Sequence, residues 1–232
     1  MDNKTIKVSN ISPLPIPHSP FPPQVWIVRH GNRHDFVYPE WFNHAEKKYD
    51  PPLSEDGIIQ AKAVAKRLEN EPIKYIFCSP FLRAIQTAYP IAIALNLSIN
   101  LESGLGEWHN KDWMDTKPLT QYPDNLDKKY LDIINWDYQP QIYPQYPETL
   151  EEIYQRTAQT TNILTQYPNP LIVGHSVAIQ GIIKALRKAE YQPITIPLCS
   201  LSKLSYINDK WQWELQADTT HLNHLPPPKI AQ

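Results

Sequence analysis

The sequence has few cysteines and no long apolar run. Its two cysteines, Cys78 and Cys199, are too few for a disulfide framework or a cysteine-rich zinc site. The apolar stretches fall well short of the roughly 20 residues that cross a bilayer. The N-terminal residues also lack the apolar core of a signal peptide. We therefore expect reduced thiols, no membrane association and a cytoplasmic location.

Clusters of positive charge are also missing. The formal net charge is -2, and no run of Lys or Arg forms a basic patch, which argues against a nucleic-acid partner. Apolar residues make up 41% and charged residues 20%, the balance of an ordinary globular protein. The length of 232 residues suits one domain with insertions, or at most two small domains. The oligomeric state is left open.

Glycine is scarce, whereas proline is abundant, with 6 glycines against 24 prolines. Because glycine alone tolerates positive φ and close backbone approach at little cost, its few positions are informative. Gly31, Gly104, Gly106 and Gly174 each lie near a histidine or glutamate that could carry chemistry. The scarce glycines therefore direct attention to those side chains.

The prolines mark the domain organisation. Residues 13–23 read PLPIPHSPFPP, which favours a polyproline II conformation that cannot pack a core. We expect a flexible leader over residues 1–23, a folded domain over 24–217 and a tail over 218–232. Residues 104–147 show no regular period and are dense in aromatic side chains, so we interpret them as an insert or cap over the sheet.

Strands and helices alternate along the folded domain. Residues 25–28, VWIV, form a continuous apolar run that is typical of a strand buried on both faces of a parallel sheet. Further strands are expected at 73–78, 97–101 and 171–173, with a C-terminal hairpin of 201–206 and 211–215. This alternation predicts a three-layer α/β sandwich with a mostly parallel central sheet flanked by helices.

Capping signals locate the helices. Ser54 can cap a helix that runs to about Asn70, and residues 149–152, TLEE, form a capping box for a helix to about Tyr167. Residues 79–80 should open a helix with Pro80 in its first turn, and Pro90 should kink or end it. A last helix follows His175 to about Lys188, and residues 37–52 are expected to form a loop.

Charged side chains follow the predicted strands. The first strand ends in Arg29, His30 and Gly31, the second delivers Arg83, and the fourth ends before His175. Glu107 follows the third strand at a short distance. Because ligands of open α/β sheets bind beyond the carboxyl ends of the strands, we expect these side chains to meet in one pocket.

These residue types suit a phosphate group. Arginine presents a planar, always charged fork that matches phosphate oxygens, and helix N-termini add N–H donors. No P-loop or GxGxxG pattern favours a nucleotide, and no metal-ligand spacing such as HExxH occurs, so we expect neither a metal nor another cofactor. An imidazole can attack phosphorus if its other nitrogen donates to a fixed acceptor, for example a carbonyl near Gly31. Glu107 is the candidate proton donor.

In order and spacing, the motifs resemble the histidine phosphatase superfamily with its phosphoglycerate mutase-like fold. The motifs are RHG at residues 29–31, SPFLRAIQT at 79–87 and GH at 174–175, and the resemblance runs from about residue 24 to at least 204. It implies that His30 is the nucleophile and Glu107 the proton donor. It further implies that the phosphate is held by four side chains, those of Arg29, Arg33, Arg83 and His175.

The stretch RHGNRHD at 29–35, together with GLGEW at 104–108, is most similar to the tyrosine-phosphatase-type branch. That branch includes the phosphatase domains of the suppressors of T-cell receptor signalling. Mutases of the family usually carry a serine-type residue where Arg33 stands and an asparagine where this chain has Phe36. Arg33 could also form a plain surface ion pair with Asp35.

The resulting hypothesis is a phosphomonoester hydrolase that acts on a small-molecule or protein phosphoester through phospho-His30. Two alternatives remain open: a phosphoglycerate-type mutase, and a module that binds a phosphorylated ligand without turnover. The aromatic side chains of the insert serve either packing or recognition of an aryl or otherwise bulky phosphoester.

Overall fold

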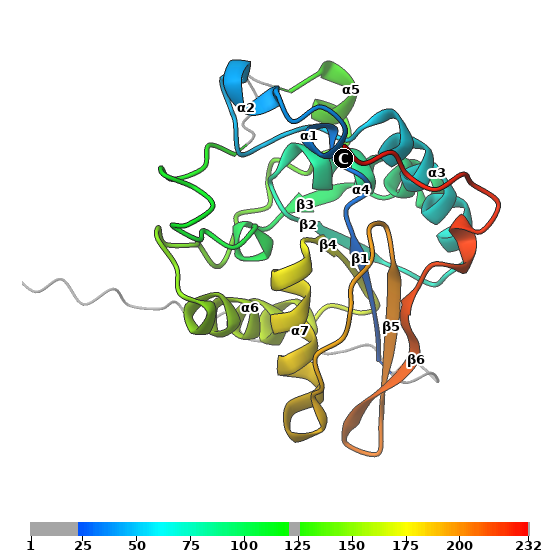
Figure 1. Cartoon of the computed structure of the whole chain (residues 1–232). Coiled ribbons are helices and arrows are strands. Elements are labelled where there is room, and N and C mark those ends of the chain that lie inside the picture. Colours follow the sequence, from blue (N-terminus) through cyan, green and yellow to red (C-terminus); the bar gives the residue numbers. More distant parts are fainter. Residues whose placement is uncertain (1–22, 121–125, 232) are drawn as a thin grey trace, which may run out of the picture.

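A computed structural model describes residues 23–120 and 126–231, so the predicted leader lies outside the described residues except for Pro23. Six strands form one sheet in the order β3-β2-β4-β1-β5-β6 (Figure 1). The first four in this order are parallel, whereas β5 is antiparallel to β1 and to β6. The strand bounds are β1 Gln24–Arg29, β2 Tyr75–Cys78, β3 Ile99–Leu101, β4 Pro170–Gly174, β5 Leu201–Ile207 and β6 Lys210–Asp218.

Helices cover both faces of this sheet, as predicted (Figure 1). The α-helices are α1 His34–Val37, α2 Trp41–His44, α3 Glu55–Leu68, α4 Leu82–Leu95, α5 Lys128–Leu131, α6 Leu150–Leu164 and α7 Ser176–Arg187. Short 3-10 helices are η1 Ser103–Leu105, η3 Lys188–Glu190 and η4 Thr220–Leu222. No α-helix of the described residues is long and apolar enough to cross a membrane.

Alternating side chains of β1 build two cores. Trp26 and Val28 pack with apolar residues of α3 and α4, whereas Val25 and Ile27 pack with residues of α6 and α7. All four side chains are buried. Burial on both faces explains why this strand is a continuous apolar run rather than an alternating pattern.

The predicted helix caps are confirmed. The Ser54 hydroxyl accepts from the Gly57 N–H at 3.1 Å at the start of α3. Thr149 forms a complete capping box, in which its hydroxyl accepts from Glu152 N–H and the Glu152 carboxylate accepts from Thr149 N–H. The predicted hairpin is also present as β5 and β6.

Two local expectations are wrong, and one of the two outcomes expected at Pro90 is excluded. Pro80 precedes the helix, because Phe81 is the N-cap of α4. Pro90 does not end the helix, since α4 continues through it to Leu95. An interior proline costs a helix about 3 kcal/mol, but burial of Ile85, Ala88, Ile91 and Ala92 around it outweighs that local cost. Residues 37–52 form more than a loop, since they contain α2 and the end of α1.

A buried carboxylate anchors the segment that follows β3. Glu102 is fully buried, and its carboxylate accepts hydrogen bonds from the Tyr138 hydroxyl and from the backbone N–H groups of Gly104, Gln141 and Ile142. It thereby joins the start of the predicted insert to its returning arm. Local sequence does not reveal this role, because Glu102 resembles an ordinary polar residue at a strand end.

The loop after β1 packs very closely against the start of α3. The Asn32 carbonyl accepts from Ser54 N–H at 2.9 Å, and the Asn32 N–H donates to the Gln60 side chain at 2.8 Å. A Cβ on Gly57 would lie only 2.1 Å from the Asn32 oxygen. The C-terminal segment adds a third contact, since Asn32 Nδ2 donates to the Lys229 carbonyl at 2.9 Å.

This close approach predicts the effect of Gly57→Ala. The added methyl group must push the Asn32 loop and α3 apart, which should lower the free energy of unfolding by about 3 kcal/mol. Urea denaturation at neutral pH measures the change. Lys62→Ala, at an exposed position of the same helix, serves as the control and should change stability by less than about 0.5 kcal/mol. Equal stability of Gly57→Ala and the wild type would contradict the close packing.

Candidate active site

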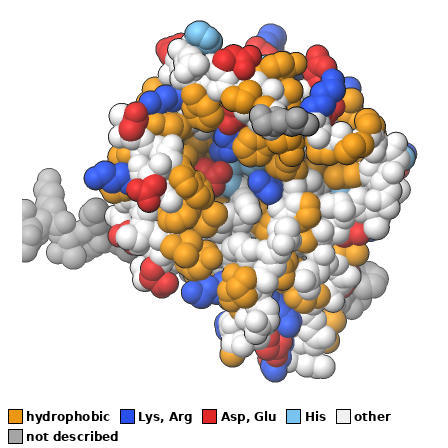
Figure 2. Space-filling view, viewed as in Figure 1, with side chains coloured by type: hydrophobic (Ala, Val, Ile, Leu, Met, Phe, Trp, Pro, Cys, Tyr) orange, Lys and Arg blue, Asp and Glu red, His pale blue; other side chains and the backbone are white. Residues whose placement is uncertain are grey.

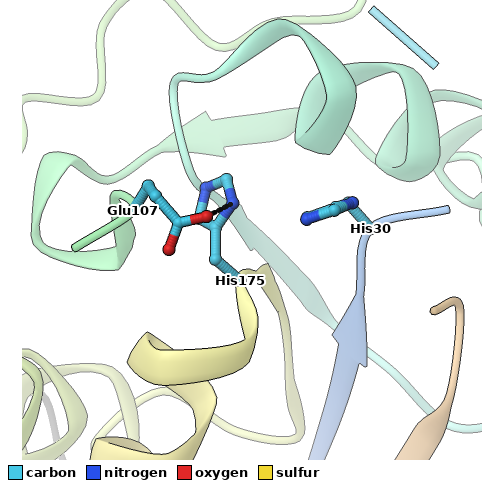
Figure 3. A group of neighbouring side chains, drawn as sticks. All are labelled: His30, Glu107 and His175. Atoms are coloured by element: carbon cyan, nitrogen blue, oxygen red, sulfur yellow. Dashed lines mark ion pairs between the residues drawn. The ribbon is translucent and has the colours of Figure 1, made fainter. Parts of the chain in front are cut away.

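The carboxyl ends of the central strands meet at one edge of the sheet, where the predicted side chains gather. In the parallel register Arg29 of β1 lies beside Gly174 of β4, and Cys78 of β2 beside Val173. The His30 N–H continues this pairing by donating to the Gly174 carbonyl at 3.0 Å. Figure 3 shows the result: His30 after β1, His175 at the start of α7 and Glu107 on the loop after η1 face one another.

His30 is held in one orientation and one tautomer. Its side chain is buried, and Nδ1 lies 2.8 Å from the Gly31 carbonyl oxygen. Because a carbonyl oxygen only accepts, Nδ1 carries the proton and Nε2 keeps a free lone pair. Burial lowers the pKa of His30 well below its ordinary value, and the charge of Arg83 lowers it further. The ring is therefore neutral at neutral pH.

His175 lies across the site from His30, with the ring centroids 5.2 Å apart. Its Nε2 is 2.7 Å from the Ser79 hydroxyl, and its Nδ1 is 3.4 Å from Glu107 Oε2. Burial lowers the pKa of His175 well below its ordinary value, followed by the charge of Arg83. Glu107 thus contacts the second histidine directly, as the dashed line in Figure 3 shows.

Arg83 is the most buried charge of the site, with only 1% of the residue exposed. It donates to the Tyr49 carbonyl at 3.3 Å and lies 3.4 Å from Glu107 Oε2 and 3.6 Å from Asp50 Oδ1. Its guanidinium also stacks over the Phe81 ring at 4.7 Å. Burial lowers the pKa of Arg83 to about 10, which still leaves it charged at neutral pH.

The other two arginines come from the end of β1 and from the loop that follows it. Arg29 donates to the Ile196 carbonyl at 2.6 Å, and burial lowers its pKa. Arg33 pairs with the buried Asp35, with Nε 2.9 Å from Oδ1, and its guanidinium lies over the Phe36 ring at 4.4 Å. The Arg33–Asp35 ion pair, the alternative considered for Arg33, is therefore present, but its carboxylate is buried rather than at the surface. After burial, the charge of Arg33 is the next largest cause that lowers the pKa of Arg83.

Two supporting residues were missed by the sequence reasoning. The Asp50 carboxylate accepts from Leu82 N–H at 2.7 Å at the start of α4 and faces Arg83. Arg156 of α6 is buried and binds the loop that carries Glu107. Asp50 lies in a stretch without periodicity and gave no signal, whereas Arg156 could have been noticed as a charge on the buried stripe of an amphipathic helix.

Three side chains of the site form a group that could hold a metal ion. His30, Glu107 and His175 each offer one ligand atom, and these atoms lie within 4.8 Å of one another. Two imidazoles and one carboxylate are a donor set that zinc accepts. However, the charges of Arg29, Arg33 and Arg83 act on His30, so the surrounding field opposes a cation and favours an anion.

The site opens at the bottom of a hollow. Figure 2 shows acidic, basic and histidine side chains on the floor of this hollow and hydrophobic side chains around its rim. Two loops are joined beside the site, because Asp115 accepts from Lys48 at 2.8 Å and from the Tyr49 hydroxyl at 2.5 Å. Trp108, which follows Glu107, packs edge-on against the exposed Trp113 with centroids 5.0 Å apart.

A family model matches most of the chain. Residues 25–219 match the histidine phosphatase superfamily (branch 1). The chain belongs to this superfamily. The predicted superfamily and the phosphoglycerate mutase-like fold are thereby confirmed. The narrower tyrosine-phosphatase-type branch remains a prediction.

Three relatives are similar in sequence to this chain, which covers very different shares of their lengths. The 55 kDa subunit of transcription factor tau of Saccharomyces cerevisiae is 31% identical over 170 residues, which cover 66% of this chain and 38% of that protein. The ecdysteroid-phosphate phosphatase of Drosophila melanogaster is 23% identical, covering 82% and 31%. The probable phosphoglycerate mutase GpmB of Photorhabdus laumondii is 31% identical, covering 86% and 95%. The chain thus spans about a third of the first two proteins and nearly all of the third.

Solved structures share the fold. The ecdysone phosphate phosphatase of Bombix mori, in complex with tungstate, aligns with a TM-score of 0.66 at 22% identity and covers 90% of this chain and 95% of its own. A mycobacterial glucosyl-3-phosphoglycerate phosphatase aligns with a TM-score of 0.60 at 22% identity, covering 85% and 100%.

The buried neutral histidines predict how stability depends on pH. The folded-state pKa values of His30 and His175 lie below the unfolded value of about 6.5. Their contribution to the free energy of unfolding is therefore complete above that pH and is lost as the pH falls. Each of the two histidines should lower the free energy of unfolding by about 1.4 kcal/mol for each pH unit below about pH 6. Urea denaturation at pH 7.5 and 5.5 should therefore show a smaller pH dependence for His175→Gln than for the wild type. His44→Gln, at an exposed position, should keep the wild-type dependence, and equal slopes for all three would refute the account.

Proposed function

We propose that the protein is a phosphomonoester hydrolase that works through a phosphohistidine on His30, with Glu107 as the proton donor. The observation that carries this proposal is the orientation of His30. Its Nδ1–H is fixed on the Gly31 carbonyl, so the lone pair of Nε2 is available inside a buried, arginine-rich site. A neutral, pre-oriented imidazole next to a fixed positive charge is what attack on a phosphate dianion requires.

The first step transfers the phosphoryl group to the protein. His30 Nε2 forms a bond to phosphorus while the bond from phosphorus to the ester oxygen breaks. Glu107, in its protonated form, gives its proton to the departing alkoxide, so the alcohol leaves neutral. Its carboxyl group lies on the His175 side of the site, opposite His30 (Figure 3), which suits the in-line arrangement of attacking and leaving groups.

The second step releases phosphate. A water molecule takes the place of the alcohol, and the Glu107 carboxylate removes its proton as its oxygen attacks phosphorus. The bond between phosphorus and Nε2 breaks, which returns His30 to its neutral form with the proton still on Nδ1. Glu107 ends the cycle protonated, as it began.

Electrostatic stabilisation comes from three arginines and from one neutral histidine that can donate a hydrogen bond. We assign phosphate binding to Arg29, Arg33, Arg83 and His175. Arg29 Nε, Arg83 Nε and His175 Nδ1 are buried and lack a hydrogen-bond partner within the described part of the chain, so they can serve phosphate oxygens. Fixed donors of this kind stabilise the charge of the transferring group without reorganisation.

The relatives support a phosphoester substrate, either a small molecule or a protein. The printed names of the fly and silkworm proteins describe phosphatases of ecdysteroid phosphates. The hydrophobic rim in Figure 2 fits a substrate whose alcohol part is apolar. A cytoplasmic location remains part of this proposal.

The nucleophile assignment predicts that His30→Ala loses activity by at least about ten-thousandfold. Hydrolysis of an aryl phosphate measures the loss, and acid-free quench of a labelled substrate should reveal phosphohistidine in the wild type only. His44→Ala, the same substitution at an exposed histidine, should retain full activity. Undiminished turnover by His30→Ala would end the proposal. Phosphate binding with neither turnover nor phosphohistidine in the wild type would favour a binding module.

The proton-donor assignment predicts that Glu107→Gln depends strongly on the leaving group. An alkyl phosphate needs a proton on its alkoxide, so its rate should fall by about 100-fold to 10,000-fold. Formation of phosphoenzyme from an aryl phosphate with an acidic phenol should fall less than about tenfold, because that leaving group departs unprotonated. Pre-steady-state bursts separate this step from hydrolysis of the intermediate. Equal losses with both substrates would assign Glu107 another role.

A mutase is the second candidate function, favoured by the likeness to the probable phosphoglycerate mutase. In this case phospho-His30 would return its group to substrate rather than to water. The Arg33–Asp35 pair and Phe36 disfavour a mutase. They occupy the two positions at which mutases of the family usually carry a serine-type residue and an asparagine. Activation by a bisphosphorylated sugar acid would support the mutase, and hydrolysis independent of it would support the hydrolase.

A further inference from the structure

We propose that the buried Arg156–Glu148 pair positions Glu107 for proton transfer, although neither side chain belongs to the phosphate site. This inference rests on the proposed function, since it concerns the proton donor of that reaction. Glu107 follows the short helix η1 and two glycines, Gly104 and Gly106, on a segment without regular hydrogen bonding. Such a segment alone does not hold a carboxyl group to within about 0.5 Å, the tolerance that catalysis demands.

Arg156 supplies the missing rigidity from α6. Its guanidinium donates to three successive parts of the loop: to the Gly104 carbonyl at 2.8 Å, the Gly106 carbonyl at 3.2 Å and the Glu107 carbonyl at 3.2 Å. The residue is 95% buried. The planar fork of arginine has five donors in fixed directions, and a lysine cannot reproduce that arrangement.

Glu148 completes the clamp from the other side. Its carboxylate accepts from Arg156 Nε at 2.6 Å and from Nη2 at 2.8 Å, and it also accepts from His109 N–H at 3.3 Å. Its backbone carbonyl accepts from the Trp108 indole at 2.9 Å. The pair therefore fixes the backbone on both sides of Glu107, and its charges neutralise each other in a buried place.

The position of this backbone determines where the carboxyl group points. Glu107 Oε1 accepts from Trp108 N–H at 3.0 Å, which leaves Oε2 facing Arg83 and His175. A rotation of the loop would carry the Trp108 N–H, and with it the whole carboxyl group, away from the leaving group.

The same face of α6 also contacts α7, the helix that His175 caps. A Cβ on Gly104 would lie 2.1 Å from the Thr160 hydroxyl, and one on Gly181 of α7 would lie 2.1 Å from the Thr157 hydroxyl. Arg156, Thr157 and Thr160 thus place α6 in direct contact with both the proton-donor loop and α7. α6 acts as a rigid support that sets Glu107 relative to His175.

The Arg156→Lys variant distinguishes a positioning role from a merely structural one, because only a positioning role predicts different losses with alkyl and aryl phosphates. The variant keeps the charge but loses the fork, so the loop can move. We expect kcat for an alkyl phosphate to fall about 10-fold to 100-fold, the range for misplaced catalytic groups. The phosphoenzyme burst with an aryl phosphate and the inhibition constant of inorganic phosphate should change less than about threefold, because His30 and the arginines stay in place.

A double-mutant cycle gives the decisive readout. In a Glu107→Gln background, Arg156→Lys should lower alkyl phosphate hydrolysis by less than about twofold, since the group that it positions is already gone. Additive losses, or equal losses with alkyl and aryl substrates, would overturn the inference. Arg67→Lys, in the exposed ion pair with Glu71, is the matched control and should behave as the wild type.

If Arg156→Lys does not fold, Glu148→Gln takes its place in the same cycle, because the amide keeps the shape and one acceptor oxygen. The proposed function and the positioning role of Arg156 can be refuted separately. Absence of phosphohistidine in the wild type would refute the proposed function. A wild type that forms phosphohistidine, with variants that lose alkyl and aryl activity equally, would refute only the positioning role.

Discussion

The burial of the Arg83 guanidinium beside two histidines is the constraint on which the rest of the site depends. A buried positive charge is costly unless it is compensated, and here the Asp50 carboxylate compensates it in part, while the Glu107 carboxyl group lies 3.4 Å away. The same charge, added to burial, keeps His30 and His175 neutral. One arrangement therefore provides both features that the proposed function needs: a buried guanidinium that can bind an anion, and two imidazoles that stay neutral beside it.

The scaffold explains why this arrangement is stable. His30, Arg83 and His175 come from three segments that start at the carboxyl ends of neighbouring parallel strands, and the strand register fixes their mutual positions. Two cores made by opposite faces of the same strands hold the sheet between its helices. Glu107 is the exception, because it lies on an irregular loop. The buried Arg156–Glu148 ion pair, rather than a strand, holds the backbone of that loop in place.

Much of this could be predicted from local patterns. The apolar run before Arg29 indicated a strand buried on both faces, the caps at Ser54 and Thr149 located two helices, and the ordered motifs around His30, Arg83 and His175 indicated one pocket. All of these depend on interactions between residues close in sequence, or on strand ends whose meeting the α/β architecture imposes. Of the kink or end expected at Pro90, the end does not occur, because tertiary burial of α4 outweighs a local preference.

The sequence by itself determined the superfamily and the side chains that gather at the site, since the order and spacing of the motifs around His30, Arg83 and His175 are visible without the structure. The tertiary structure alone decided which nitrogen of His30 is free, because that depends on one hydrogen bond to Gly31. It also decided that Glu102, Glu148 and Arg156 are buried and bound to backbone groups rather than solvated. Their partners lie up to 52 residues away along the chain, and no local pattern reports a contact that is made only when the chain has folded.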